Sequence, residues 1–282
     1  MRGRISSAWR VLKSDKRLLA AVVMMLVLAL VALFGPMLLH YGPEEVFVTE
    51  PLSTPSWSHP MGSDVFGRDV LTRLVYGARI SLIISSAVAA GSIAVGFPLG
   101  LIIGFVGGRV DQVASRILDT MFAFPSILLA LVVATILGPG LVTVTYALIG
   151  AYVPVVTRVV RSAAISEVGQ EYVTAARVTG VRPLNIAMKH VVPNITSPLL
   201  VMASLLMSVT VLAEAALSYL GLGAQPPTSS WGKMLTEDSP YIFVAAHLSI
   251  FPGLAIAYFV LALNLMGDGL RDQLDPRIRE LL

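Results

Sequence analysis

The sequence predicts an all-α polytopic membrane protein with about six transmembrane helices and a cytoplasmic helical loop. Hydrophobic residues make up 56% of the chain and charged residues 13%, and the mean hydropathy is +0.80, whereas an ordinary soluble domain is more charged and less apolar. Uncharged segments are long enough to cross a hydrocarbon core at about 1.5 Å per residue. These segments use most of the 282 residues, which leaves no room for a sizeable soluble enzyme domain.

The first predicted span covers residues 18–39, which are apolar and uncharged. Six basic residues precede it in the segment 1–17. The apolar run is longer than the core of about 7–15 residues in a signal peptide. We therefore expect an uncleaved membrane anchor.

Two further spans are predicted from charge-free stretches near the middle of the chain. Residues 80–108 form the second span, and Asp111 and Arg116 bound a short polar loop after it. Residues 120–157 are uncharged but too long for one helix, and the Gly-Pro-Gly sequence at 138–140 interrupts them. This pattern predicts a tight hairpin of spans three and four.

The last two predicted spans are residues 195–219 and 239–267, separated by a polar connection. Trp57 and Trp231 are expected to anchor the protein at the membrane interfaces. Residues 70–78 carry an apolar helical face, which suits either an interfacial helix or a simple lead-in to span two.

Basic residues predict the orientation. Most of the 20 Lys and Arg residues lie in the amino-terminal segment, around Arg109, between 158 and 189, and in the tail, and positive charge favours the cytoplasmic side. The expected divisions are a cytoplasmic segment 1–17, a first span 18–39, an extracytoplasmic loop 40–78, a membrane core 79–270 and a cytoplasmic tail 271–282. The loop at 221–238 is expected to face outward.

The polar island 166–194 within that core is predicted to form two bent helices. Ser166 is expected to cap the first, whose early turns carry Glu167 and Glu171. Gly180 is expected to stop it, with a second short helix at 184–191. Small and basic side chains suit docking to a partner, but a solvated loop that obeys the positive-inside rule explains the arginines equally well.

The spacing of this island resembles the EAA loop of bacterial ATP-binding-cassette importer permeases. Three residues, Tyr172 to Thr174, separate the glutamate from the alanines, as is usual in the peptide and nickel branch of that family. Further stretches at 59–69, 71–82, 214–223, 226–232 and 267–277 are similar to dipeptide and oligopeptide permeases. The resemblance is carried in the island by Glu171, Ala175, Ala176, Gly180, Ile186, His190, Pro193 and Asn194.

The resemblance implies a multi-pass protein of the bacterial inner membrane with both termini in the cytoplasm. The implied partners are a second homologous permease subunit, two cytoplasmic ATPase subunits, an extracytoplasmic substrate-binding protein and the lipid bilayer, with no nucleic acid. The implied function is import of dipeptides or oligopeptides by alternating access. The island residues, with Arg182, would couple this motion to the ATPases.

The chain itself shows no ATP site, so the partner ATPase subunits would bind ATP and Mg. Its one Gly-Lys pair, at Lys233, is followed by Met234 rather than Ser or Thr. We expect no catalytic residue, no cofactor and no metal, because neither His59 nor His190 has a second ligand at a metal-binding spacing. The chain is therefore predicted not to be an enzyme.

Glu214 is the one formally charged residue well inside a predicted span. It is expected either to line the translocation path or, as we favour, to make a structural helix contact. Rival functions are import of nickel chelates or glutathione, an ion-coupled secondary transporter and an intramembrane enzyme. The secondary transporter would be expected to carry several ionisable groups within its spans.

Overall fold

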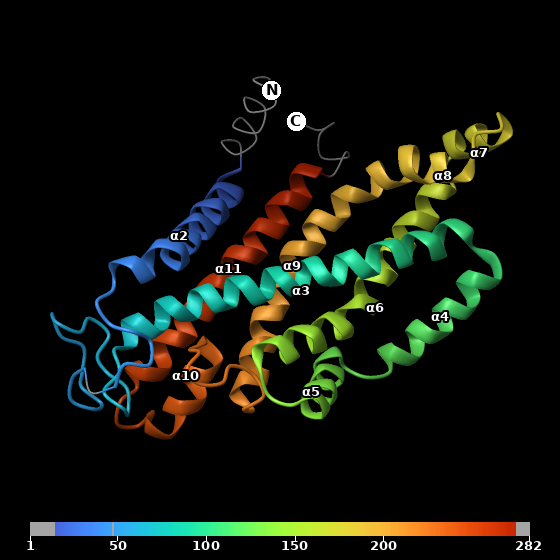
Figure 1. Cartoon of the computed structure of the whole chain (residues 1–282). Coiled ribbons are helices and arrows are strands. Elements are labelled where there is room, and N and C mark those ends of the chain that lie inside the picture. Colours follow the sequence, from blue (N-terminus) through green and yellow to red (C-terminus); the bar gives the residue numbers. More distant parts are fainter. Residues whose placement is uncertain (1–14, 47, 275–282) are drawn as a thin grey trace.

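The computed structural model describes residues 15–46 and 48–274, and over these residues it contains helices and no strand. A single isolated bridge joins Ser63 to Asp69. The prediction of an all-α protein is confirmed. The helices form an elongated bundle, in which the 40–69 loop and α10 lie at the end opposite to α7 and α8 (Figure 1).

The first helix, α2 (Lys16–Leu38), begins two residues before the predicted span, because the Asp15 carboxylate accepts from the backbone N–H groups of Arg17 and Leu18 and caps it. It packs against α11 (His247–Leu274), where the Tyr258 hydroxyl donates to the Met24 carbonyl oxygen at 3.1 Å. The last four residues of α11 extend into the predicted tail, and residues 1–14 and 275–282 lie outside the described part.

The longest helix, α3 (Val70–Val106), begins well inside the predicted loop 40–78. Asp69 caps it by accepting from the Thr72 N–H group at 2.8 Å. Its 37 residues extend about 55 Å, more than a bilayer core requires. The apolar face before residue 79 is therefore the lead-in to span two and not a separate interfacial helix.

Glycines let α3 cross α6 (Leu141–Val168) at close range. Gly96, Gly100 and Gly104 recur at every fourth position and are buried. A Cβ at Gly100 would lie 2.5 Å from the Thr157 carbonyl oxygen, and one at Gly104 would lie 2.7 Å from the Arg161 carbonyl oxygen. Small residues at this spacing allow helix backbones to approach within a membrane.

Two predictions between these helices were wrong. The short polar loop is helical, forming α4 (Gly108–Phe122), and span three is not one straight helix, because α4 and α5 (Ser126–Leu137) meet at an angle of 79°. The break lies before Pro125, whose ring disfavours helical geometry at the preceding residue. With 12 residues, α5 alone is only about 18 Å long. The turn at 138–140 does connect it to α6, as predicted.

Ion pairs join α4 to the C-terminal half of α6. The Arg161 guanidinium binds both oxygens of Asp111, with Nη2 at 2.8 Å from Oδ2. Arg158 pairs with Asp119 and lies 3.8 Å above the centre of the Phe122 ring. The charges of the predicted polar loop thus hold two helices together.

The polar island also differs from its prediction. Ser166 caps nothing, because α6 continues to Val168 and the next helix, α7 (Glu171–Val178), follows Gln170. The second short helix exists as α8 (Pro183–Ile186), but it passes through a π-helical turn, Ala187–Val191, directly into α9 (Val192–Tyr219). Pro193, the second residue of α9, follows the π-helical turn and does not interrupt this helical run.

Beyond α9, the chain folds back on itself before the last span. The helix α10 (Trp231–Asp238) and a 3-10 turn (Ser239–Tyr241) precede α11, which begins later than residue 239. Trp231 is no interfacial anchor. It is 1% exposed, donates to the Leu74 carbonyl oxygen at 2.9 Å and packs edge-on against Phe259.

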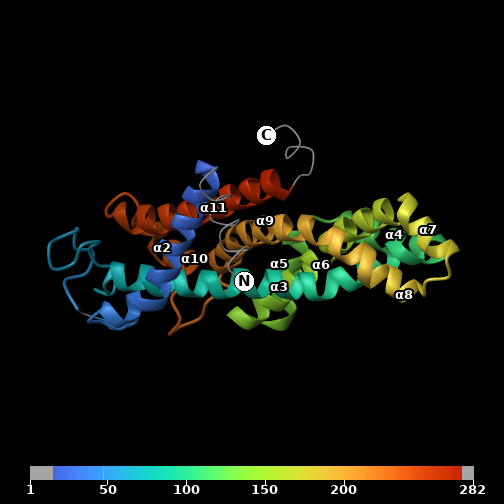
Figure 2. The same cartoon turned by 90° about the horizontal axis from the view of Figure 1, so that it is seen from above.

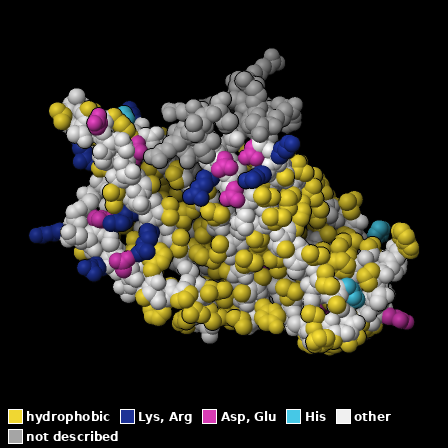
Figure 3. All heavy atoms as spheres, turned by 180° about the vertical axis from the view of Figure 1, so that it is seen from behind, with side chains coloured by type: hydrophobic (Ala, Val, Ile, Leu, Met, Phe, Trp, Pro, Cys, Tyr) yellow, Lys and Arg dark blue, Asp and Glu magenta, His cyan; other side chains and the backbone are white. Residues whose placement is uncertain are grey.

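The helix lengths fit the predicted number of spans. Five helices are long and apolar enough to cross a membrane, or six spans if the bent pair α4 and α5 counts as one. Hydrophobic side chains cover most of the face in Figure 3, with basic and acidic groups gathered along one side and the top. Seen from above, α3 runs along an elongated molecule, with α2 and α10 at one end and α7 and α8 at the other (Figure 2).

The glycine contact between α3 and α6 can be tested by substitution. Gly100→Leu should lower the thermal unfolding midpoint of the purified chain in detergent, because a side chain there meets backbone atoms that cannot move aside. Overpacking of this kind typically costs about 1–3 kcal/mol or more. Gly150→Leu in α6 is the matched control, since a Cβ there meets nothing within 4 Å. Equal midpoints for both variants would show that the crossing tolerates bulk.

Candidate coupling site

The end of α7 is defined by a Schellman motif. The Val181 N–H group donates to the Ala176 carbonyl oxygen at 3.1 Å, and the Gly180 N–H group donates to the Arg177 carbonyl oxygen at 3.1 Å. Gly180 has a φ of +77°, which disfavours any residue with a side chain. A Cβ on Gly180 would meet nothing within 4 Å. The glycine is therefore required for its backbone angle and not for space.

A hydrogen-bonded clamp holds the base of α7 to its two neighbours. Tyr172 donates its hydroxyl to the Glu167 carboxylate at the end of α6. Asn194, at the start of α9, donates to Glu167 Oε1 at 2.7 Å and to the Tyr172 hydroxyl oxygen at 2.9 Å. Partial burial and the adjacent Glu167 carboxylate raise the pKa of Tyr172. The Tyr172 hydroxyl therefore keeps the proton that it donates to Glu167.

Apolar contacts complete the attachment. Val173 is the fully buried residue of α7, and Ile186 and Val191 are buried in the segment that follows. The Arg177 guanidinium lies 5.8 Å from the centre of the Phe105 ring at the end of α3. Residues at the ends of α3, α6 and α9 therefore all contact α7, so α7 is fixed to the spans and is not a free loop.

The segment from Glu171 to Asn194 exposes apolar side chains among its polar ones. We define the apolar tip by three of these side chains: Val178, 83% exposed, Leu184, 71% exposed, and Met188, 55% exposed. Arg182 and Lys189 are also exposed beside it. A rigid apolar surface with a basic rim is the chemistry of a protein docking site.

The structure brings the predicted site residues together in the segment 171–194 but gives them different environments. Those that face solvent can meet a partner, whereas those that are covered pack within the element. Glu171, Ala175, Gly180, Arg182 and Pro193 are exposed, Ala176 and His190 are partly buried, and Ile186 is buried. His190 lies with its ring centre 6.0 Å from that of Tyr172.

Sequence reasoning missed the clamp and the apolar tip. In the sequence Tyr172 stands only in the spacer before the alanines, and its partners Glu167 and Asn194 are 27 residues apart in the chain. The tip could have been found, because Leu184 and Met188 stand four residues apart and a short helix places such residues on one face. Gly96, Gly100 and Gly104 also have a spacing that the sequence displays.

Glu214 is buried on α9, with 2% of its surface exposed. Its Oε1 accepts from the Ser218 hydroxyl at 2.7 Å, and the Ser218 oxygen accepts from the Ala224 N–H group at 3.3 Å. Its Oε2 has no hydrogen-bond partner among the described residues. The carboxylate thus connects through one serine to the loop that follows α9.

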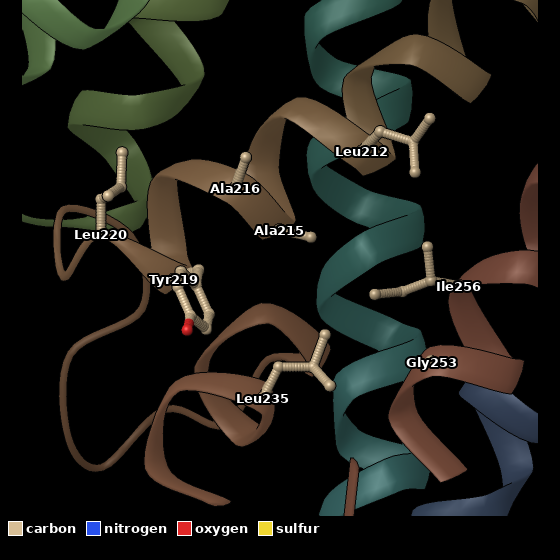
Figure 4. Close-up of a pocket in the computed structure, with 8 residues that line it drawn as sticks. All are labelled: Leu212, Ala215, Ala216, Tyr219, Leu220, Leu235, Gly253 and Ile256. Carbon is tan, nitrogen blue, oxygen red and sulfur yellow. The ribbon is translucent and has the colours of Figure 1, made fainter. Parts of the chain in front are cut away.

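A pocket of about 540 Å³ lies on a different face of α9 from Glu214. Figure 4 shows Tyr219 of α9 and the next residue, Leu220, on one side and Leu235 of α10 and Ile256 of α11 on the other. The lining is almost entirely apolar, and Glu214 is not part of it. The charged group inside the span therefore does not face this opening.

Comparison with known proteins covers both parts of the chain. Residues 96–280 match the family model for the binding-protein-dependent transport system inner membrane component, and this region contains the whole coupling site. Residues 4–55 match the N-terminal transmembrane domain of oligopeptide transport permease C.

Several curated proteins are similar over nearly the full length. The dipeptide transport system permease protein DppC of Escherichia coli K12 is 42% identical, covering 96% of this chain and 93% of its own length. The DppC protein of Alkalihalophilus pseudofirmus and the di/tripeptide permease DppC of Pseudomonas aeruginosa are each 41% identical, covering 96% of this chain and 90% and 91% of their own lengths. The chain belongs to the family of binding-protein-dependent transport system inner membrane components.

Proposed function

We propose that this chain is a transmembrane permease subunit of an ATP-driven importer and that its cargo is dipeptides or oligopeptides. The substrate class rests on the similar proteins, which are named as dipeptide and di/tripeptide permeases at 41% to 42% identity. The observation that supports the mode of action is the rigid coupling site at one end of the bundle. Its attachment to three long helices suits a part that passes a partner's motion into the spans.

The partners in this proposal are a second permease subunit, two cytoplasmic ATPase subunits that bind ATP and Mg, and an extracytoplasmic substrate-binding protein. The apolar tip, with Glu171, Ala175 and Ala176 beside it, would enter a cleft of an ATPase subunit. The basic rim at Arg182 and Lys189 would meet acidic groups there. Nucleotide-driven closure of the ATPases would then move α6 and α9 through the clamp at Tyr172.

Rival assignments differ in what they require of the membrane interior. An importer of nickel chelates or glutathione would use the same coupling site, so only uptake assays with the purified complex distinguish it. An ion-coupled transporter would need titratable groups along an open path. Glu214 is instead covered and bonded to Ser218, which favours a structural role for it.

The orientation in this proposal places α7 in the cytoplasm and the 40–69 loop outside. Because the chain has no cysteine, single exposed thiols can report sidedness. Ser58→Cys in intact cells should react with a membrane-impermeant maleimide, whereas Thr179→Cys should react only after the membrane is permeabilised. The opposite pattern would invert the proposed topology.

Substitutions on the coupling site should separate docking from folding. Ala176→Trp adds bulk beside the tip, and Gly180→Val forces a branched side chain onto a positive φ, at a cost of about 1–3 kcal/mol. Both should leave membrane insertion intact, abolish ATP-dependent uptake and reduce recovery of the ATPase subunits. Uptake and pull-down are measured on the same membranes.

The matched control for these variants is Arg182→Ala, which removes one exposed charge from the same element. An exposed ion pair contributes about 0–1 kcal/mol, so uptake should fall only slightly. Normal ATPase recovery and transport by both bulky variants would mean that this element is a solvated loop.

For Glu214, a structural role predicts different outcomes for two substitutions. Glu214→Gln keeps the size and the acceptor for Ser218, so most transport should remain. Glu214→Leu removes the acceptor and should lower the amount of assembled complex, because the buried Ser218 hydroxyl loses its hydrogen-bond acceptor. Uptake normalised to assembled complex is the readout. Normal assembly with a changed substrate preference would instead place Glu214 in the translocation path.

A further inference from the structure

A buried charge network joins α10 to the start of α3, at the end of the bundle opposite to the coupling site. Asp64 Oδ2 accepts from Arg68 Nε at 2.5 Å and from Arg73 Nη1 at 2.6 Å. Glu237 Oε2 accepts from the same two guanidinium groups at 2.6 Å and 2.7 Å. Asp64 and Arg73 are fully buried. These contacts connect the 40–69 loop, α3 and α10.

Two outer groups complete the network. Glu44 pairs with Arg68 at 2.8 Å, and Lys233 Nζ lies 3.8 Å from Glu237 Oε1. Three cations therefore face three carboxylates: Arg68, Arg73 and Lys233 against Glu44, Asp64 and Glu237. Burial opposes ionisation of Glu237, but Arg73 and Arg68 outweigh it and lower its pKa. Glu237 is thus a stably charged member of a balanced set.

Asp238 is a fourth carboxyl beside this balanced set. It ends α10, its side chain is fully buried, and neither oxygen has a hydrogen-bond partner within the described part of the chain. A second negative charge next to Glu237, without a donor of its own, is costly in a buried site. A neutral carboxylic acid avoids most of that cost.

No other ionised partner compensates Asp238. The charges that act on it are those of Arg73, Asp64, Glu237 and Arg68. The remaining charged or basic groups at this end of the helices that pack against α10 are Arg79 on α3, Glu214 on α9 and His247 on α11. The tyrosines there are Tyr76 on α3, Tyr219 on α9 and Tyr241 on the 3-10 turn. None of these groups is hydrogen-bonded to Asp238 in the described residues.

We propose that Asp238 is a proton-binding site that controls the packing of α10, so that this helix is held against α3, α9 and α11 when Asp238 is neutral and loosens when Asp238 is ionised. The network then responds to pH on the side of the membrane where α10 lies. In the proposed topology that side is the extracytoplasmic medium.

The direction of the pH effect follows from proton linkage. Burial raises the pKa of Asp238 to about 7; Arg73 opposes the rise, and Asp64 and Glu237 add to it. In an opened state Asp238 would return toward its ordinary value near 3.8. Between these values the packed state binds a proton that the open state lacks, so packing weakens as pH rises from about 4 to about 7 and then levels off.

The test uses Ser229→Cys as a buried reporter in the purified, fully assembled transporter. Ser229 is 2% exposed, and its hydroxyl has no hydrogen-bond partner among the described residues, so a thiol is a small change there. Its maleimide labelling rate is divided by that of an exposed Ser58→Cys variant, which cancels the pH dependence of thiol ionisation. From pH 5.5 to 8.5 this ratio should rise, by up to about 30-fold if α10 opening governs labelling.

Two further variants identify the group responsible. Asp238→Asn, which mimics the neutral acid, should give a low ratio that does not change with pH. Glu237→Gln removes the shared acceptor of two arginines, so it should raise the ratio at low pH. It also removes a charge that raises the pKa of Asp238, so the ratio should level off at a lower pH than in the parent.

The proposal fails if the ratio in the Ser229→Cys transporter is independent of pH or falls as pH rises. It also fails if Asp238→Asn retains the pH dependence. The first criterion needs no change at Asp238, so it holds even if the asparagine variant does not assemble.

Discussion

The backbone contact between α3 and α6 is the constraint on which the rest of the structure depends. Gly100 and Gly104 bring α3 so close to Thr157 and Arg161 that no side chain fits between the two helices. Within a membrane the hydrophobic effect does little to draw helices together, so such close van der Waals packing has to supply the association. Ion pairs from the same half of α6 then hold α4, including the bidentate contact of Arg161 with Asp111.

This contact also determines where the coupling site lies. The clamp between Glu167, Tyr172 and Asn194 begins at the last turn of α6, so α7 is carried by the helix that α3 supports. A load applied to the apolar tip would pass into α6 through hydrogen bonds and into α9 through a continuous helix. Elements of this kind move together because packed helices deform little.

The two ends of the bundle use charge in opposite ways. Around α7 the basic groups are exposed, where water screens them and a partner can reach them. Around α10 the arginines are buried and paired. Among the described residues there, Asp238 is the carboxyl without a hydrogen-bond partner, and its burial favours the protonated form. The first arrangement suits reversible docking, and the second makes helix packing sensitive to protonation.

The sequence by itself determined the all-α fold class, the approximate number of spans and the place of the polar island 166–194. Continuous apolar runs of about 20 residues have the length of membrane-spanning helices, which satisfy their own backbone hydrogen bonds. Gly180 followed by Pro183 ends one helix and starts another through local backbone preferences. Tertiary structure decided the burial of Trp231, the clamp at Tyr172 and the isolation of Asp238. Each of these depends on groups brought together from distant parts of the chain, and local pattern carries no information about such contacts.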